Sequence, residues 1–149
     1  MTRIALALAT IFSLAVTPLA AQDYQKGLAA YEAGDYSAAL EEWRPLANQG
    51  NAVAQVELGG MYRRGEGVPQ NNAEAMRWFR LAAQQGDPLH QLILGITFLQ
   101  GDVIPYDYVE AVMWFRLGAC QGHAQSQRFL AFAYQKGQGV PQNNVMAYM

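Results

Sequence analysis

The amino-acid sequence predicts an all-α fold, an α-solenoid built of antiparallel helix pairs. The first observation behind this prediction is a repeat: Gln-Gly pairs begin at positions 49, 85 and 121, so 85 − 49 and 121 − 85 both equal 36. Pro69, Pro105 and Pro141 keep the same spacing, since 105 − 69 and 141 − 105 are also 36. The second observation is that each repeat holds two segments with apolar residues at helical spacing, divided by glycine and proline. Stacked copies of such a unit form a solenoid.

Residues 1–21 have the pattern of a cleaved signal peptide. Arg3 supplies a positive charge, an apolar run follows with only Thr10 and Ser13 as polar breaks, and small residues lead up to Ala21. We therefore expect cleavage after Ala21 and export, either to the periplasm or out of the cell. The alternative is an uncleaved membrane anchor, but the apolar run is short against the roughly 20 residues that a spanning helix needs. No membrane span is expected after cleavage.

A divergent first unit occupies residues 22–50. A segment rich in small and apolar residues precedes a tight turn at Gly34 and Asp35, and a second such segment contains Trp43. Trp43 lies 35 residues before Trp78 (78 − 43), one fewer than the repeat spacing. A divergent terminal unit of this kind is expected to cap the array.

The complete units are residues 51–86 and 87–122. In the former, Asn51 is expected to cap the start of the first helix with its side-chain oxygen. Leu58, Gly59 and Tyr62 then share one helix face, and the glycine predicts a close approach of the partner helix. Gly65 is expected to end this helix in a left-handed conformation.

The second helix of the same unit is expected to begin at Asn71. Glu74 follows three residues later, which is the spacing of a capping box. Trp78 and Phe79, repeated at 114 and 115, are predicted to be buried in the core. Gly86 is expected to close the helix as a left-handed cap. The second unit places Asp87 and Pro88 at its first helix start, and Asp107 and Glu110 at its second.

These residues together resemble the Sel1-like repeat, a relative of the tetratricopeptide (TPR) repeat. The residues that carry the resemblance are Ala52, Gln55, Leu58-Gly59, Tyr62, Gly65, Gly67-Val68-Pro69, Ala75, Trp78-Phe79, Ala82-Ala83 and Gln85-Gly86. The first unit is more similar to a TPR. The resemblance implies a right-handed superhelix that serves as an interaction scaffold. Val103 and Tyr106 depart from the pattern in the second unit, so its loop is expected to be stiffer or turned differently.

Residues 123–149 form an incomplete third unit. The counterpart of Trp114 would fall at position 150 (114 + 36), just beyond Met149. The second helix of this unit, from Asn143 onward, is expected to be too short to cover the helix before it. One hypothesis is therefore that the chain is a truncated remnant of a longer repeat protein. Its unfinished C-terminal edge would then allow self-association.

Composition and charge exclude several classes of function. A hydrophobic content of 52% belongs to a folded chain, not a disordered one. The formal net charge is −2, or −3 once Arg3 is removed with the signal (−2 − 1), and no block of basic residues is present. Such a chain has no electrostatic footprint for nucleic acid or for an anionic membrane.

No constellation of residues predicts catalysis, a metal or a cofactor. His90 and His123 are isolated and are interpreted as a surface residue and a helix-start residue. The single cysteine, Cys120, matches Gln84 of the preceding unit and is expected to be partly exposed, where it would either be inert or link two chains. A cysteine-rich branch of Sel1-like proteins has had β-lactam hydrolysis ascribed to it, and this activity is kept as an alternative. That branch has paired cysteines in each repeat, unlike this chain.

A partner-binding face is predicted on the first helices of the units. In a repeat array, binding uses positions that vary on a constant framework. The face opposite the framework residues varies between units and becomes apolar toward the C-terminus. The residues predicted to contact a partner are Arg64, Leu89, Ile93, Ile96, Phe129, Phe132 and Lys136. An apolar stripe with polar ends would suit a partner helix or peptide; the alternative is that neighbouring helices cover it.

The function predicted from the sequence is therefore that of an exported protein–protein interaction scaffold or adaptor of the cell envelope. Its partner is expected to be a protein or peptide.

Overall fold

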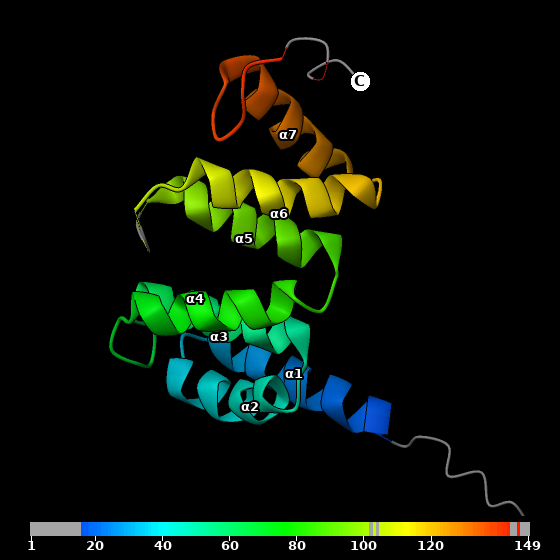
Figure 1. The fold of residues 1–149 in the computed structure, drawn as a ribbon. Helices are drawn as coiled ribbons and strands as arrows, with labels where there is room; N and C mark the ends of the chain where they lie inside the picture. Colours follow the sequence, from blue (N-terminus) through cyan, green and yellow to red (C-terminus); the bar gives the residue numbers. More distant parts are fainter. Residues whose placement is uncertain (1–15, 102, 104, 144–145, 147–149) are drawn as a thin grey trace, which may run out of the picture.

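The computed structural model describes residues 16–101, 103, 105–143 and 146, and these residues form helices joined by short turns and loops (Figure 1). The helices are α1 (Val16–Glu32), α2 (Tyr36–Asn48), α3 (Ala52–Arg64), α4 (Asn72–Ala83), α5 (Pro88–Gln100), α6 (Tyr108–Cys120) and α7 (Ala124–Lys136). Each helix packs against the next, and the pairs α1–α2, α3–α4 and α5–α6 stack in chain order, with α7 at the far end (Figure 1). The predicted all-α solenoid of antiparallel pairs is confirmed.

The helix boundaries of the first complete repeat follow the predicted caps. The Asn51 Oδ1 atom accepts a hydrogen bond of 2.9 Å from the Ala54 N–H at the start of α3. Gly65 ends α3 at φ +71°, a left-handed conformation that costs glycine little. Asn71 caps α4 by accepting a bond of 3.1 Å from the Glu74 N–H.

The capping box predicted at the start of α4 is only half formed. The Asn71 N–H donates to the Tyr62 carbonyl oxygen at 2.9 Å, and the Glu74 carboxylate pairs with Arg77, with 2.6 Å between Oε2 and Nε. Asp107 uses its own N–H in the same way one repeat later, at 3.1 Å. The capping box predicts a second hydrogen bond, from the Asn71 N–H to the Glu74 carboxylate. That prediction was wrong, because the Asn71 N–H already donates to a carbonyl oxygen of α3.

Glycines on the framework face let the paired helices approach closely, as predicted. A Cβ atom built on Gly59 would lie 2.7 Å from the Phe79 ring, and one on Gly95 would lie 2.5 Å from the Phe115 ring. No Cβ is tolerated at such distances unless the ring moves, and both rings are buried. The glycine and the phenylalanine of each repeat therefore form one packing unit.

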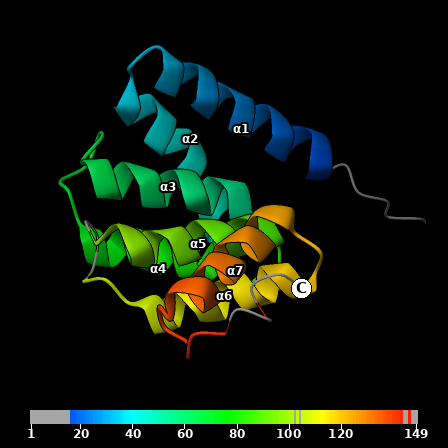
Figure 2. The ribbon, with the colours of Figure 1, turned by 90° about the horizontal axis from the view of Figure 1, so that it is seen from above.

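The core is a series of clusters along the stack, not one centre. One cluster joins α2, α3 and α4 around Trp43 and Trp78, and the next joins α4, α5 and α6 around Phe79 and Phe115. A small third cluster lies between α6, α7 and the segment that follows α7. The prediction that Trp114 is buried like Trp78 was too strong, since Trp114 is only partly buried. Figure 2 shows the same helices from above: α1 and α2 lie on one side of α3, and α5, α6 and α7 lie on the other.

A polar connection recurs between repeats. The Gln85 Nε2 atom donates to the Gly50 carbonyl oxygen and to the Gln55 Oε1 atom, both at 2.9 Å. The same two bonds run from Gln121 to the Gly86 carbonyl oxygen and the Gln91 Oε1 atom, at 2.9 and 3.0 Å. The repeat spacing in the sequence marked these glutamines, but only the structure shows that each ties the end of its repeat to the first helix of the same repeat and to the last residue of the repeat before it.

The loop of the second repeat differs from the loops of its neighbours, as expected. In the first and third repeats, Gln70 and Gln142 each donate from Nε2 to a carbonyl oxygen seven positions earlier, at 2.9 and 3.0 Å. Tyr106 stands at this position in the second repeat and is 65% exposed. Val103 is buried against the core of α5 and α6, so an apolar side chain anchors this loop.

The two ends of the sequence carry predictions that the structure tests only in part. Residues 1–15 of the predicted signal peptide lie outside the described residues, and 16–21 belong to the start of α1. In the predicted short C-terminal helix, the Met146 N–H donates to the Asn143 Oδ1 atom at 3.1 Å, which is a helix-start bond. The remaining residues of that helix, 144–145 and 147–149, lie outside the described residues.

Candidate partner-binding site

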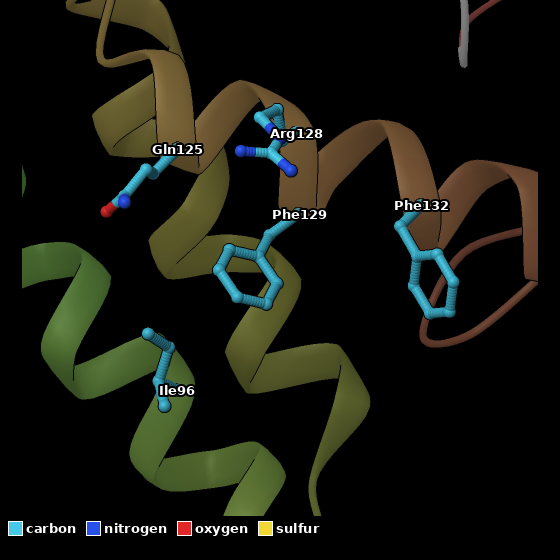
Figure 3. A pocket seen from close by; sticks show the side chains of 5 residues that line it. All are labelled: Ile96, Gln125, Arg128, Phe129 and Phe132. Carbon is cyan, nitrogen blue, oxygen red and sulfur yellow. The ribbon is translucent and has the colours of Figure 1, made fainter.

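Three of the seven residues predicted to contact a partner meet in one pocket. Ile96 of α5 and Phe129 and Phe132 of α7 line it, together with Gln125 and Arg128 (Figure 3). The pocket has a volume of about 590 Å³, which is within the range of ligand-binding pockets in proteins. It lies between two helices that are 36 positions apart in the repeat, so packing of successive units creates it.

The aromatic wall of the pocket is fixed on one side and open on the other. Phe129 stacks on the buried Phe115 ring, with 4.9 Å between ring centroids and 15° between planes, and 36% of its surface remains exposed. Phe132 is 51% exposed, and the Lys136 ammonium lies 5.9 Å from its ring centroid. An exposed phenylalanine beside a fixed one is an apolar surface that a partner side chain would desolvate favourably.

Arg128 also lines the pocket and was not among the residues predicted to contact a partner. It lies three residues after Gln125 and four before Phe132, so the three side chains share one stripe of α7. That helical spacing was the signal that could have found it. Arg128 brings a positive charge to the apolar pocket.

Leu89 and Ile93 lie on α5 but do not line the pocket. Leu89 is 50% exposed near the start of the helix. Ile93 is partly buried and packs against the core cluster of α5 and α6. Neighbouring helices therefore cover Ile93 in part, which was the alternative to partner binding at this position.

Arg64 is engaged within the chain. Its Nη2 atom donates to the Tyr31 hydroxyl at 2.9 Å, and its Nε atom lies 2.8 Å from the Glu66 carboxylate. The Tyr31 hydroxyl itself donates to the same carboxylate at 2.9 Å. Helix α1 therefore reaches Arg64, which does not line the pocket formed by α5 and α7.

A second contact of α1 with this face perturbs an acidic group. The Tyr24 hydroxyl donates to the Glu57 Oε1 atom at 3.2 Å. Burial raises the pKa of the Glu57 carboxyl above its ordinary value, and the hydrogen bond from Tyr24 and the charge of Arg64 only partly oppose this. Burial, followed by the nearby Glu57 charge, also raises the pKa of the Tyr24 phenol. These groups fasten α1 to α3.

The histidines and the cysteine are the residues that the sequence offers for chemistry. Among the described residues, no group of three His, Cys, Asp or Glu side chains is placed to hold a metal ion. The His123 Nδ1 atom lies 2.9 Å from the Ser126 hydroxyl at the start of α7, and the His90 side chain is only 12% exposed, less than expected of a surface residue. Cys120 is exposed, in agreement with its register.

Another pocket, of about 540 Å³, lies on the surface of α2. Its lining residues are Leu40, Glu41, Arg44, Pro45 and Asn48. They come from one helix, so this pocket does not depend on the stacking of repeats.

The fold and the pocket between its units define a helical repeat protein. The sequence model described as Sel1 repeat matches residues 52–87, 91–123 and 124–149. The chain belongs to the Sel1 repeat family. Proteins of this family are generally protein–protein interaction scaffolds and are typically non-enzymatic.

Solved structures agree with this assignment. A crystal structure of a protective antigen present in uropathogenic Escherichia coli strains, described as displaying an SLR fold, is 38% identical to this chain with a TM-score of 0.76. A Sel1 repeat protein from Oxalobacter formigenes is 32% identical, with a TM-score of 0.72. The matches cover 86% and 83% of this chain, but only 28% and 51% of the two relatives. Comparison with curated proteins gives no match. No helix among the described residues has both the length and the apolar character needed to cross a membrane.

Proposed function

We propose that this chain is an exported scaffold of the cell envelope that binds a protein partner through the surface between α5 and α7. The observation that carries the proposal is the pocket in which Ile96, Phe129 and Phe132 meet, since an apolar surface exposed on a repeat array is typical of a partner site.

Two further observations support export to the envelope. Residues 1–21 have the charge, apolar run and small residues of a signal peptide. The E. coli relative is described as a protective antigen, a description that favours a location outside the cytoplasm. The periplasm and the outside of the cell both fit these observations.

Export has a direct test. We expect the chain isolated from its own cells to occur in the envelope or secreted fraction and to begin at or within one residue of Gln22, as read by N-terminal sequencing. A chain that keeps Met1 and stays in the cytoplasm would contradict the export part of the proposal.

Partner binding is tested by photo-crosslinking in the same cells. A photoreactive phenylalanine analogue replaces Phe132 in one variant and Val109 in the control, which is 66% exposed on α6 outside the pocket. We expect a discrete crosslinked protein from position 132 that is absent from position 109. Crosslinks of equal strength at both positions, or at neither, would remove the support for this surface.

A further inference from the structure

The helices that line the α5–α7 pocket carry basic side chains and no acidic ones. α5 contains no Asp, Glu, Lys or Arg, while α7 contains Arg128 and Lys136. The pocket therefore combines an apolar wall with a local positive charge, in a chain whose formal net charge is −2. A cation beside an apolar surface favours a partner that offers both an apolar side chain and a carboxylate.

Arg128 stands apart from the other arginines in the part of the chain that the structure describes. Among the described residues, it makes no ion pair, hydrogen bond or ring contact. The other arginines within residues 16–143 each have a partner: Arg44 with Tyr62, Arg63 with Gln100, Arg64 with Glu66, Arg77 with Glu74, Arg80 with Phe98, and Arg116 with Tyr134. Lys136 is held over the Phe132 ring. A guanidinium that has no internal carboxylate as a partner breaks no ion pair when it binds a carboxylate of another molecule.

We infer that the α5–α7 pocket binds an acidic peptide segment, in which an aromatic or aliphatic side chain enters between Ile96, Phe129 and Phe132 while a carboxylate pairs with Arg128. This inference rests on the proposed function and names the chemistry of the partner. Arg128 and Phe132 are four residues apart on α7, slightly more than one helical turn, or about 6 Å along the helix axis. The matching acidic and apolar residues of a helical partner are therefore spaced three or four positions apart.

The chemistry of the surface distinguishes this partner from two others. A basic peptide finds no carboxylate on α5 or α7 to pair with. Proteins bind anionic membranes through clusters of several basic residues, whereas α7 contains only two basic residues.

The test selects peptides from a random dodecapeptide phage library on the immobilised full chain and measures binding of the fluorescein-labelled peptides by anisotropy. We expect the selected peptides to share an Asp or Glu near an aromatic or aliphatic residue. Arg128→Gln should weaken their binding about tenfold, and so should replacement of the peptide carboxylate by an amide. Because the two changes remove the same interaction, their combination should weaken binding little further.

Matched variants separate charge, shape and fold. Arg128→Lys should restore part of the affinity lost in Arg128→Gln, because the positive charge is kept. Arg44→Gln changes an exposed arginine of the other pocket and should leave binding within about twofold of the original. Phe132→Ser removes a half-exposed ring and should weaken binding without changing the helical circular dichroism spectrum.

Several outcomes would overturn the inference. Selected peptides without an acidic residue, or peptides that bind Arg128→Gln as tightly as the original chain, would exclude the carboxylate pair. If those peptides still depended on Phe132, the proposed function would stand with a different partner chemistry. If benzylpenicillin displaced the peptides, the pocket would instead be a binding site for a small molecule with a carboxylate, and the inference of a peptide partner would be wrong. A library that yields no binder would refute the inference, while the crosslinking at position 132 decides the proposed function separately.

Discussion

Two adjacent glycines in α3 should respond in opposite ways to the same substitution. Gly59 faces the buried Phe79, where a new Cβ would lie 2.7, 2.8 and 3.1 Å from three ring carbons. Gly60 faces the far end of the exposed Arg64 side chain, where the nearest atom to a new Cβ is a guanidinium nitrogen at 3.1 Å. The helix is the same, so the comparison isolates packing.

The magnitudes follow from two opposing effects. Alanine in place of glycine within a helix stabilises the folded state by up to about 1 kcal/mol at either position. Overpacking a core that cannot yield costs about 1–3 kcal/mol, and it applies to Gly59→Ala because Phe79 is only 3% exposed. Gly60→Ala asks Arg64 to move by a few tenths of an ångström. The free energy of unfolding should therefore be lower in Gly59→Ala than in Gly60→Ala by about 1–3 kcal/mol.

Urea unfolding followed by far-ultraviolet circular dichroism measures this difference, provided that the dependence on urea concentration stays the same in both variants. A second comparison in a Phe79→Leu background should shrink the difference, because the smaller side chain leaves room for the new methyl group. If Gly59→Ala were as stable as Gly60→Ala in the original background, close packing of Gly59 against Phe79 would be refuted.

Three further predictions concern single contacts. Gln85→Ala should lower the free energy of unfolding by about 1–2 kcal/mol in urea melts, because it leaves the buried Gln55 Oε1 atom without its donor; an unchanged midpoint would mean that the hydrogen bonds of Gln85 add nothing to stability. Asn71→Ala should cost about 1 kcal/mol through loss of the α4 cap, whereas Asn71→Asp should cost less, in the same assay. Glu57 has a folded-state pKa above its ordinary value of 4.5, so its contribution favours the folded state at low pH and is lost as the pH rises through the folded pKa. The free energy of unfolding of Glu57→Gln, measured relative to that of the original chain, should therefore increase as the pH is raised from acidic to neutral. A difference between the two chains that stays constant across that range would contradict the burial of this carboxyl.

Much of the candidate site could be predicted from the sequence because the repeat fixes register. Knowing that Ile96, Phe129 and Phe132 stand opposite the framework face was enough to expect them on one surface. The sequence did not distinguish them from Ile93, which is partly buried against the same core cluster as Ile96, because only the packing of α7 decides which of the two lines the pocket. Nor did it show that Arg128 has no partner among the described residues, because that depends on where every other charged side chain lies in space.

Arg64 shows the same limit at the other end of the array. Its register equates it with Gln100 and Lys136, but α1 places Tyr31 against it and Glu66 completes the contact. A divergent terminal unit is the part of a repeat protein where register is the weakest guide, because its side chains differ from those of the other units.

The sequence alone determined the fold class and most helix ends. These features depend on local physics that recurs every 36 residues: side-chain caps such as Asn51 and Asn71, left-handed glycines such as Gly65, and apolar residues at helical spacing. Only the tertiary structure decided which exposed residues form a site. The pocket arises where α5 and α7, far apart in the chain, pack across α6, so its shape and its free positive charge belong to the arrangement of the helices and to no single repeat.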